Sequence, residues 1–151
     1  MRIVVVEDEA PIREGMAKLL SKINPEYELV GKAADGEAGY QLIRELNPDL
    51  VIMDIRMPKM DGIAMMKKLR EENIKCKAII LSAYSEFQYA QKAIELKADS
   101  YLLKPIKIPE LKSALKQAER EISEDQGTEQ IFSVENIMSV SYTHLRAHET
   151  L

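Results

Sequence analysis

Five side chains that can bind a metal ion or a phosphate group lie at or just after the ends of short apolar runs in this 151-residue chain. They are Glu7, Asp8, Asp54, Ser82 and Lys104. Crowded carboxylates repel one another unless a cation or a shared proton compensates their charge. Mg²⁺ suits such oxygen ligands, and a lysine with a hydroxyl can bind phosphoryl oxygens. The set is typical of an aspartate that accepts phosphate by nucleophilic attack, with a metal and Lys104 offsetting the developing charge.

The spacing of apolar residues predicts five strands that alternate with five helices. The strand-like runs cover residues 3–6, 27–33, 50–53, 78–81 and 100–103. Pro11 suits the first turn of the first helix, Asp35 and Ser85 can cap the second and fourth, Asp61 opens the third, and the fifth follows Pro109. The predicted inner faces are Ile12, Met16, Leu19 and Ile23 in the first helix; Ala38, Leu42 and Leu46 in the second; Met65, Met66 and Leu69 in the third; and Leu111, Leu115, Ala118 and Ile122 in the fifth.

Alternation of strands and helices predicts an α/β fold, in which a five-stranded parallel sheet is flanked by five helices. The second run, residues 27–33, alternates apolar and polar residues and suits an edge, whereas the first, third and fourth runs are solidly apolar. The resulting strand order is 2-1-3-4-5, the doubly wound, flavodoxin-like arrangement. Ligands of such sheets bind at the carboxyl ends of the strands, beside the switch point between strands one and three. All five side chains named above fall at that edge.

Composition excludes several classes of protein. A hydrophobic content of 46% supports a real core, while the net charge of −4 argues against direct nucleic-acid binding by this chain. Cys76 is the single cysteine, so neither an internal disulfide nor a cysteine-based zinc site can form. The start does not read as a signal peptide, and no apolar run approaches the ~18 residues of a membrane span. We therefore expect a cytoplasmic protein without membrane contact.

The final residues are treated separately, because residues 140–150 resemble the translated read-through of a transposon-type sequencing adapter. His144 and His148, the two histidines of the chain, both lie within them. Setting this segment aside removes any histidine general base or Ser/His/Asp triad. We predict a domain over residues 1–122, a linker or the start of a truncated connector over 123–139, and a non-native tail over 140–151. The native protein is then expected to continue beyond residue 139.

Four motifs, in order and at their spacings, resemble the receiver domain of two-component response regulators. They read VVVEDEA, DLVIMDIRMPKMDG, AIILSAY and DSYLLKP. The resemblance implies that Asp54 is the phosphoacceptor and that Lys104 is the lysine of the site. It further implies the metal ligands Glu7, Asp8, Asp54 and the backbone carbonyl of Arg56, the switch residues Ser82 and Tyr101, and a cis peptide bond before Pro105. The one departure is mild: Glu7 stands where the family often has Asp.

The same resemblance implies partners. A sensor histidine kinase would donate the phosphoryl group and dock on the outward face of the first helix, at Arg13, Glu14, Ala17 and Lys18. Residues 81–105 look like receivers joined to an AraC-type helix-turn-helix output domain, which is missing here. A phosphorylation-dependent homodimer is also expected, through the face formed by the fourth helix, the fifth strand and the fifth helix.

Other functions remain open at this point. A stand-alone receiver and a receiver with another output are the nearest alternatives. A Mg²⁺-dependent phosphatase could also use an aspartyl nucleophile, but such enzymes normally need a second Asp where this chain has Arg56. A nucleotide-binding loop lacks its Lys-Ser/Thr pair here, and aromatic residues at 5% are few for a flavin site. We therefore expect a signalling domain rather than an enzyme.

Overall fold

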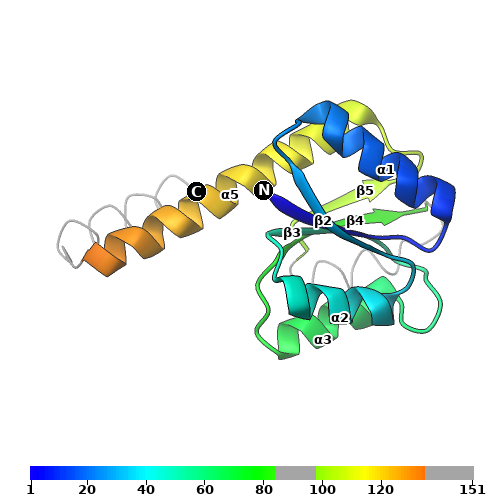
Figure 1. Cartoon of the computed structure of the whole chain (residues 1–151), viewed down its shortest axis with the longest axis horizontal. Coiled ribbons are helices and arrows are strands. Elements are labelled where there is room, and N and C mark those ends of the chain that lie inside the picture. The colour runs from blue at the N-terminus through cyan, green and yellow to red at the C-terminus, as the bar shows by residue number, and fades with distance from the viewer. Residues whose placement is uncertain (84–97, 135–151) are drawn as a thin grey trace. The chain divides into compact units, whose positions relative to one another are not determined.

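The computed structural model describes residues 1–83 and 98–134, and for residues 126–134 the backbone alone. Its central feature is a sheet of five parallel strands (Figure 1). The strands are β1 Arg2–Val6, β2 Glu28–Ala33, β3 Leu50–Asp54, β4 Lys77–Ser82 and β5 Ser100–Leu103. Their order is β2-β1-β3-β4-β5, with β1 hydrogen-bonded to both β2 and β3. The predicted α/β flavodoxin-like sheet and its strand order are confirmed.

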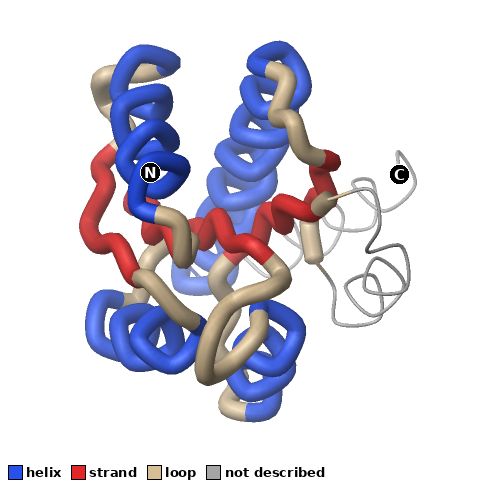
Figure 2. Tube along the Cα trace, turned by 90° about the vertical axis from the view of Figure 1, so that its right-hand side faces the viewer, coloured by secondary structure: helices blue, strands red, loops and turns tan. Residues whose placement is uncertain are grey.

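Helices lie on both faces of this sheet. They are α1 Ala10–Ile23, α2 Gly36–Leu46, α3 Gly62–Glu71 and α5 Ile108–Val134. In Figure 2, α2 and α3 cover one face, and α1 lies on the other together with the first turns of α5. The predicted fourth helix, which would begin at Ser85, lies outside the described residues. Within the described part of the chain, the structure thus has four helices where the sequence predicts five.

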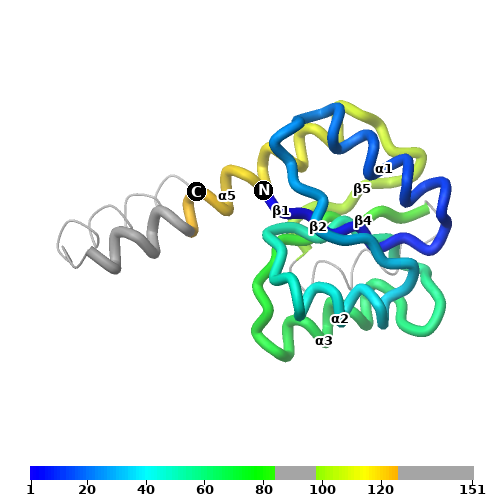
Figure 3. Tube along the Cα trace, in the orientation of Figure 1, coloured from blue at the N-terminus to red at the C-terminus, as the bar shows by residue number. Residues whose placement is uncertain are grey.

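The central strands are buried because helices cover both faces. Every residue of β3 is buried, and in β1 only Arg2 is partly exposed. β2 lies at the edge and keeps exposed or partly exposed positions, as its alternating sequence predicts. The chain, coloured along its length in Figure 3, passes from β1 to the edge strand β2 and then to β3 on the other side of β1. Because β1 and β3 pair in parallel, their carboxyl ends lie side by side, and the site lies at these ends.

Two helix starts form as their sequences predict. The Asp35 carboxylate accepts a hydrogen bond from the Ala38 amide at 2.7 Å, and Asp61 does the same for the Ala64 amide. These bonds satisfy amides that have no partner within the helix. In α3 the predicted inner face is confirmed, since Met65, Met66 and Leu69 are all buried.

The predicted inner faces of α1 and α2 are partly wrong. In α1 the buried residues are Met16 and Leu20, whereas Ile12 is 37% exposed. In α2 they are Gly36, Gly39, Tyr40 and Ile43, and the expected Leu42 and Leu46 only border the core. Each helix carries neighbouring residues that could face inward, so apolar spacing alone leaves its rotation undecided. Packing against the sheet decides it.

By its internal contacts the chain divides into a unit from Met1 to Leu115 and a second unit that begins at Lys116. In α5, Leu111 and Leu115 are fully buried, as expected. The helix runs on to Val134, past residue 122, where the sequence suggests a linker or connector. The predicted domain boundaries stay predictions, and residues 140–151 lie outside the described residues. None of the helices among the described residues is both long enough and apolar enough to span a bilayer.

Candidate functional site

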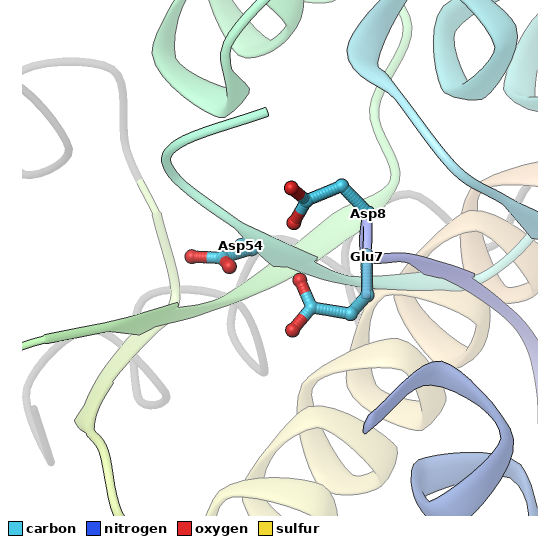
Figure 4. A group of neighbouring side chains, drawn as sticks. All are labelled: Glu7, Asp8 and Asp54. Atoms are coloured by element: carbon cyan, nitrogen blue, oxygen red, sulfur yellow. The ribbon is translucent and has the colours of Figure 1, made fainter. Parts of the chain in front are cut away.

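Three carboxylates meet at the carboxyl edge of the sheet. β1 ends at Val6 and is followed directly by Glu7 and Asp8, while Asp54 ends the neighbouring strand β3. Because β1 and β3 are parallel partners, both ends reach the same edge. One oxygen from each of the three carboxylates lies within 4.8 Å of the others (Figure 4). The juxtaposition predicted from strand order is present in the structure.

Lys104, the residue that follows β5, brings a positive charge to these carboxylates across the intervening strand β4. Its Nζ atom lies 2.8 Å from Oδ2 of Asp54 and 3.2 Å from Oε1 of Glu7. The Lys104 amide donates to the Ser82 carbonyl at 2.7 Å, which ties the residue to the end of β4. The peptide bond between Lys104 and Pro105 is cis, as the motif predicts.

Asp54 is held from two sides. Lys104 contacts one carboxylate oxygen, and the amide of Ile55 donates to the other, Oδ1, at 2.7 Å. The Asp54 side chain is 11% exposed, so these bonds form in a largely desolvated setting. Hydrogen bonds to both oxygens fix the direction of the carboxylate while leaving an opening to the solvent.

Glu7 is the most deeply buried of the three carboxylate residues. The residue is 2% exposed, and its Oε2 atom is buried without a hydrogen-bond partner among the described residues. Burial first, and then the Asp54 carboxylate beside it, raise the pKa of Glu7 from 4.5 to about 7, although Lys104 acts in the opposite direction. A buried oxygen without a partner, next to two more carboxylates, fits a hard cation. The residues present therefore fit Mg²⁺, and the exposed Asp8 leaves its side of the cluster open to water.

Two glycines hold the loop between β3 and α3 close to the site. A Cβ atom at Gly62 would lie 2.4 Å from the carbonyl oxygen of Asp54, and one at Gly36 would lie 1.9 Å from that of Met60. The Gly62 amide also donates to the Ile55 carbonyl at 2.7 Å. This loop contains Arg56, whose carbonyl the sequence predicts as a metal ligand. Neither glycine was among the predicted site residues, because the need for each appears only when the loop packs.

The predicted switch residues lie on β4, which neighbours the strand of Asp54, and on β5, the strand beyond it. Asp54 is the register partner of Leu81, so Ser82 lies one position further along β4. Ser82 is fully buried, and its hydroxyl donates to the Ala83 carbonyl at 3.1 Å. Tyr101 on β5 is partly buried and packs against the core. Their roles in switching stay predictions.

The structure places the Arg13 side chain differently from the sequence prediction. The sequence places its side chain on the outward face of α1, but this side chain is 18% exposed. Its Nη1 atom donates to the Glu7 backbone carbonyl, just beyond the end of β1, at 2.7 Å. Glu14 and Lys18 on the same helix are exposed, as expected.

Comparison with known proteins agrees with this geometry. Residues 3–116 match the response regulator receiver domain. The chain is 34% identical over 116 residues to the nitrate/nitrite response regulator protein NarL of Escherichia coli K12, covering 77% of this chain and 53% of that protein. The chain spans about half the length of the curated relatives it matches.

Solved structures give the same result. The REC domain of AraT, a response regulator from Geobacillus stearothermophilus, is similar with a TM-score of 0.75 and 35% identity, over 83% of this chain and 97% of that one. A DNA-binding response regulator of the LuxR family from Staphylococcus aureus has a TM-score of 0.73 and 29% identity, over 78% of this chain and 97% of that one. The chain belongs to the response regulator receiver domain family, the receivers of two-component systems.

Proposed function

We propose that Asp54 accepts a phosphoryl group from a sensor histidine kinase and thereby switches an attached output domain. The observation that carries this proposal is the Lys104 ammonium, 2.8 Å from the Asp54 carboxylate, on a site with two further carboxylates. A structural ion pair would need one carboxylate for one ammonium. Three carboxylates around one lysine leave a negative site, which suits a cation together with an incoming phosphoryl group.

In the proposed transfer, an Asp54 oxygen attacks the phosphorus of the kinase's phosphohistidine. The P–O bond to Asp54 forms, the P–N bond to the histidine breaks, and the histidine nitrogen keeps the electron pair. Glu7, Asp8, Asp54 and the Arg56 carbonyl are the residues proposed to hold Mg²⁺, which would neutralise charge on the phosphoryl oxygens. The ammonium group of Lys104 would shift its contact from the Asp54 carboxylate to a phosphoryl oxygen.

The first test of this proposal uses acetyl phosphate as a small phosphate donor. Incubation with Mg²⁺ is expected to add one phosphate per chain, labile to hydroxylamine as an acyl phosphate should be. Intact-mass spectrometry measures the gain, and peptide mapping after borohydride reduction locates it. EDTA is expected to prevent the gain. Repeated turnover of simple phosphate esters would favour the aspartyl phosphatase instead, and a hydroxylamine-stable phosphate would contradict an Asp54 acceptor.

We infer that an output domain attached to this receiver would regulate transcription. Support comes from the NarL and LuxR-family relatives, one of which is described as DNA-binding. The resemblance of residues 81–105 to AraC-type regulators is a finer prediction, and none of the three relatives named above is described as AraC-type. A stand-alone receiver is the alternative. The gene sequence that follows codon 139 distinguishes these outcomes, and it also tests whether residues 140–150 are adapter-derived.

Phosphorylation is proposed to act through Ser82 and Tyr101. A phosphoryl group on Asp54 would draw the Ser82 hydroxyl toward it, and the Tyr101 ring would turn into the vacated space. Beryllofluoride, which mimics the phosphoryl group, is expected to raise dimer affinity about tenfold in wild type. Ser82→Ala and Tyr101→Ala should each reduce this gain while leaving phosphorylation intact. Sedimentation velocity measures the affinity, and a full gain in both variants would contradict the switch.

A further inference from the structure

We propose that Arg13 is a positioning residue that holds the Glu7–Asp8 turn in the geometry needed for Mg²⁺ binding. The inference rests on the proposed function of that site and adds a residue to it from α1. Arg13 acts through the protein backbone. Its hydrogen bond to the site is to the Glu7 backbone carbonyl, and not to the carboxylates of Glu7, Asp8 or Asp54.

The backbone of Glu7 lies just beyond the last residue of β1 and is hydrogen-bonded on both sides. Its amide donates to the Ala33 carbonyl of β2 at 3.0 Å, continuing the pairing with that strand. Its carbonyl accepts the 2.7 Å hydrogen bond from Nη1 of Arg13. Since Glu7 is 2% exposed, a carbonyl without this donor would be buried and unpaired, which is costly. Arg13 therefore stabilises the conformation of the turn in which the Glu7 carbonyl accepts its hydrogen bond.

Neighbouring charged side chains restrict the orientation of the Arg13 side chain. Its Nε atom lies 4.0 Å from a carboxylate oxygen of Glu14, and Lys32 on β2 contacts both carboxylate oxygens of Glu14, at 2.8 and 3.0 Å. Lys32 and Arg13 also hold the pKa of Glu14 below its usual range. The edge strand is thus connected through Glu14 to the guanidinium, and through the guanidinium to the acidic turn. Exposed pairs of this kind are weak singly, but together they limit the directions open to Arg13.

A purely electrostatic role of Arg13 and a positioning role predict opposite changes in Mg²⁺ affinity when Arg13 is removed. The proposal can therefore be tested. If Arg13 acted only as a positive charge near the cluster, its removal would tighten Mg²⁺ binding, because less repulsion would oppose the cation. If it positions the turn, its removal weakens binding, because the carboxylates leave their shared geometry. Losses of about tenfold are typical when a group that orients metal ligands is removed.

The experiment compares Arg13→Met with Lys18→Met. Both substitutions remove one positive charge from α1 and keep an unbranched apolar stem, but Lys18 is exposed on the outer side. Isothermal titration calorimetry with MgCl₂ is expected to give a dissociation constant about tenfold higher for Arg13→Met. For Lys18→Met we expect a value equal to or slightly below that of wild type. An unchanged or tighter Mg²⁺ affinity in Arg13→Met would overturn the proposal.

Urea unfolding in EDTA separates positioning from mere support of the fold. A purely structural role would lower stability while leaving the Mg²⁺ affinity of the folded protein unchanged, and that result would count against the proposal. Arg13→Lys, which retains a donor, is the second variant if Arg13→Met does not fold, and it should recover part of the affinity. Failure of the proposed function is recognised separately, as a wild type that takes no phosphate from acetyl phosphate.

Discussion

Asp54→Asn is expected to abolish phosphorylation by acetyl phosphate, the largest effect predicted for this protein. The amide has no anionic oxygen to attack phosphorus, and neither Glu7 nor Asp8 has the same placement. Asp54 alone of the three carboxylates receives both an amide hydrogen bond on one oxygen and the closest approach of Lys104 on the other. Intact-mass spectrometry after incubation with acetyl phosphate and Mg²⁺ measures the loss.

Asp8→Asn is the matched control, since it makes the same chemical change within the same cluster. It should retain phosphorylation but require more Mg²⁺, because one anionic ligand is lost while the acceptor remains. Circular dichroism spectra of both variants should match wild type. Phosphate on Asp54→Asn at the wild-type level, or a normal rate and Mg²⁺ dependence in Asp8→Asn, would show that the site is wrongly assigned.

Lys104→Met is expected to have the second-largest effect, on stability and phosphotransfer together. Methionine keeps the apolar stem but removes the ammonium that lies 2.8 Å from Asp54 and 3.2 Å from Glu7. Breaking a buried charge pair costs about 3–5 kcal/mol, and because Lys104 is 27% exposed we expect about 2 kcal/mol in the absence of metal. Phosphorylation should slow by about a hundredfold, as for the loss of one charged donor at a reacting oxygen.

Mg²⁺ and pH provide the controls for Lys104→Met. Saturating Mg²⁺ should restore more stability to the variant than to wild type, since the ion replaces the missing positive charge. Burial lowers the pKa of Lys104, but Asp54 and Glu7 together raise it more, so that it lies above its ordinary 10.5. The ammonium is therefore fully charged at neutral pH, and its charge is lost only in strongly alkaline solution. Urea unfolding at neutral pH should therefore show the full difference. Equal stability of the two proteins in EDTA would contradict the role assigned to Lys104.

The local sequence is sufficient to predict much of this fold and the location of its site. Strand-length apolar runs separated by helical periods lead to a parallel sheet, and the solidly apolar runs are central because helices cover both faces. Parallel strands end at the same edge, so Glu7, Asp8 and Asp54 had to converge once the order was known. The capping residues Asp35 and Asp61 are equally local, because each carboxylate bonds an amide within its own first turn.

Packing decides what local sequence leaves open. The inward side of α1 is Met16 and Leu20 because the helix rotates to fit the sheet, and the same rotation and helix placement bring Arg13 to the carbonyl of Glu7. Gly36 and Gly62 are required only because the backbone of another part of the chain passes closer to each than a Cβ atom would allow. The raised pKa of Glu7 likewise depends on its burial in the folded chain. Periodicity reports which residues prefer an interior, whereas rotation, close approach and desolvation arise from contacts between elements that the chain brings together only on folding.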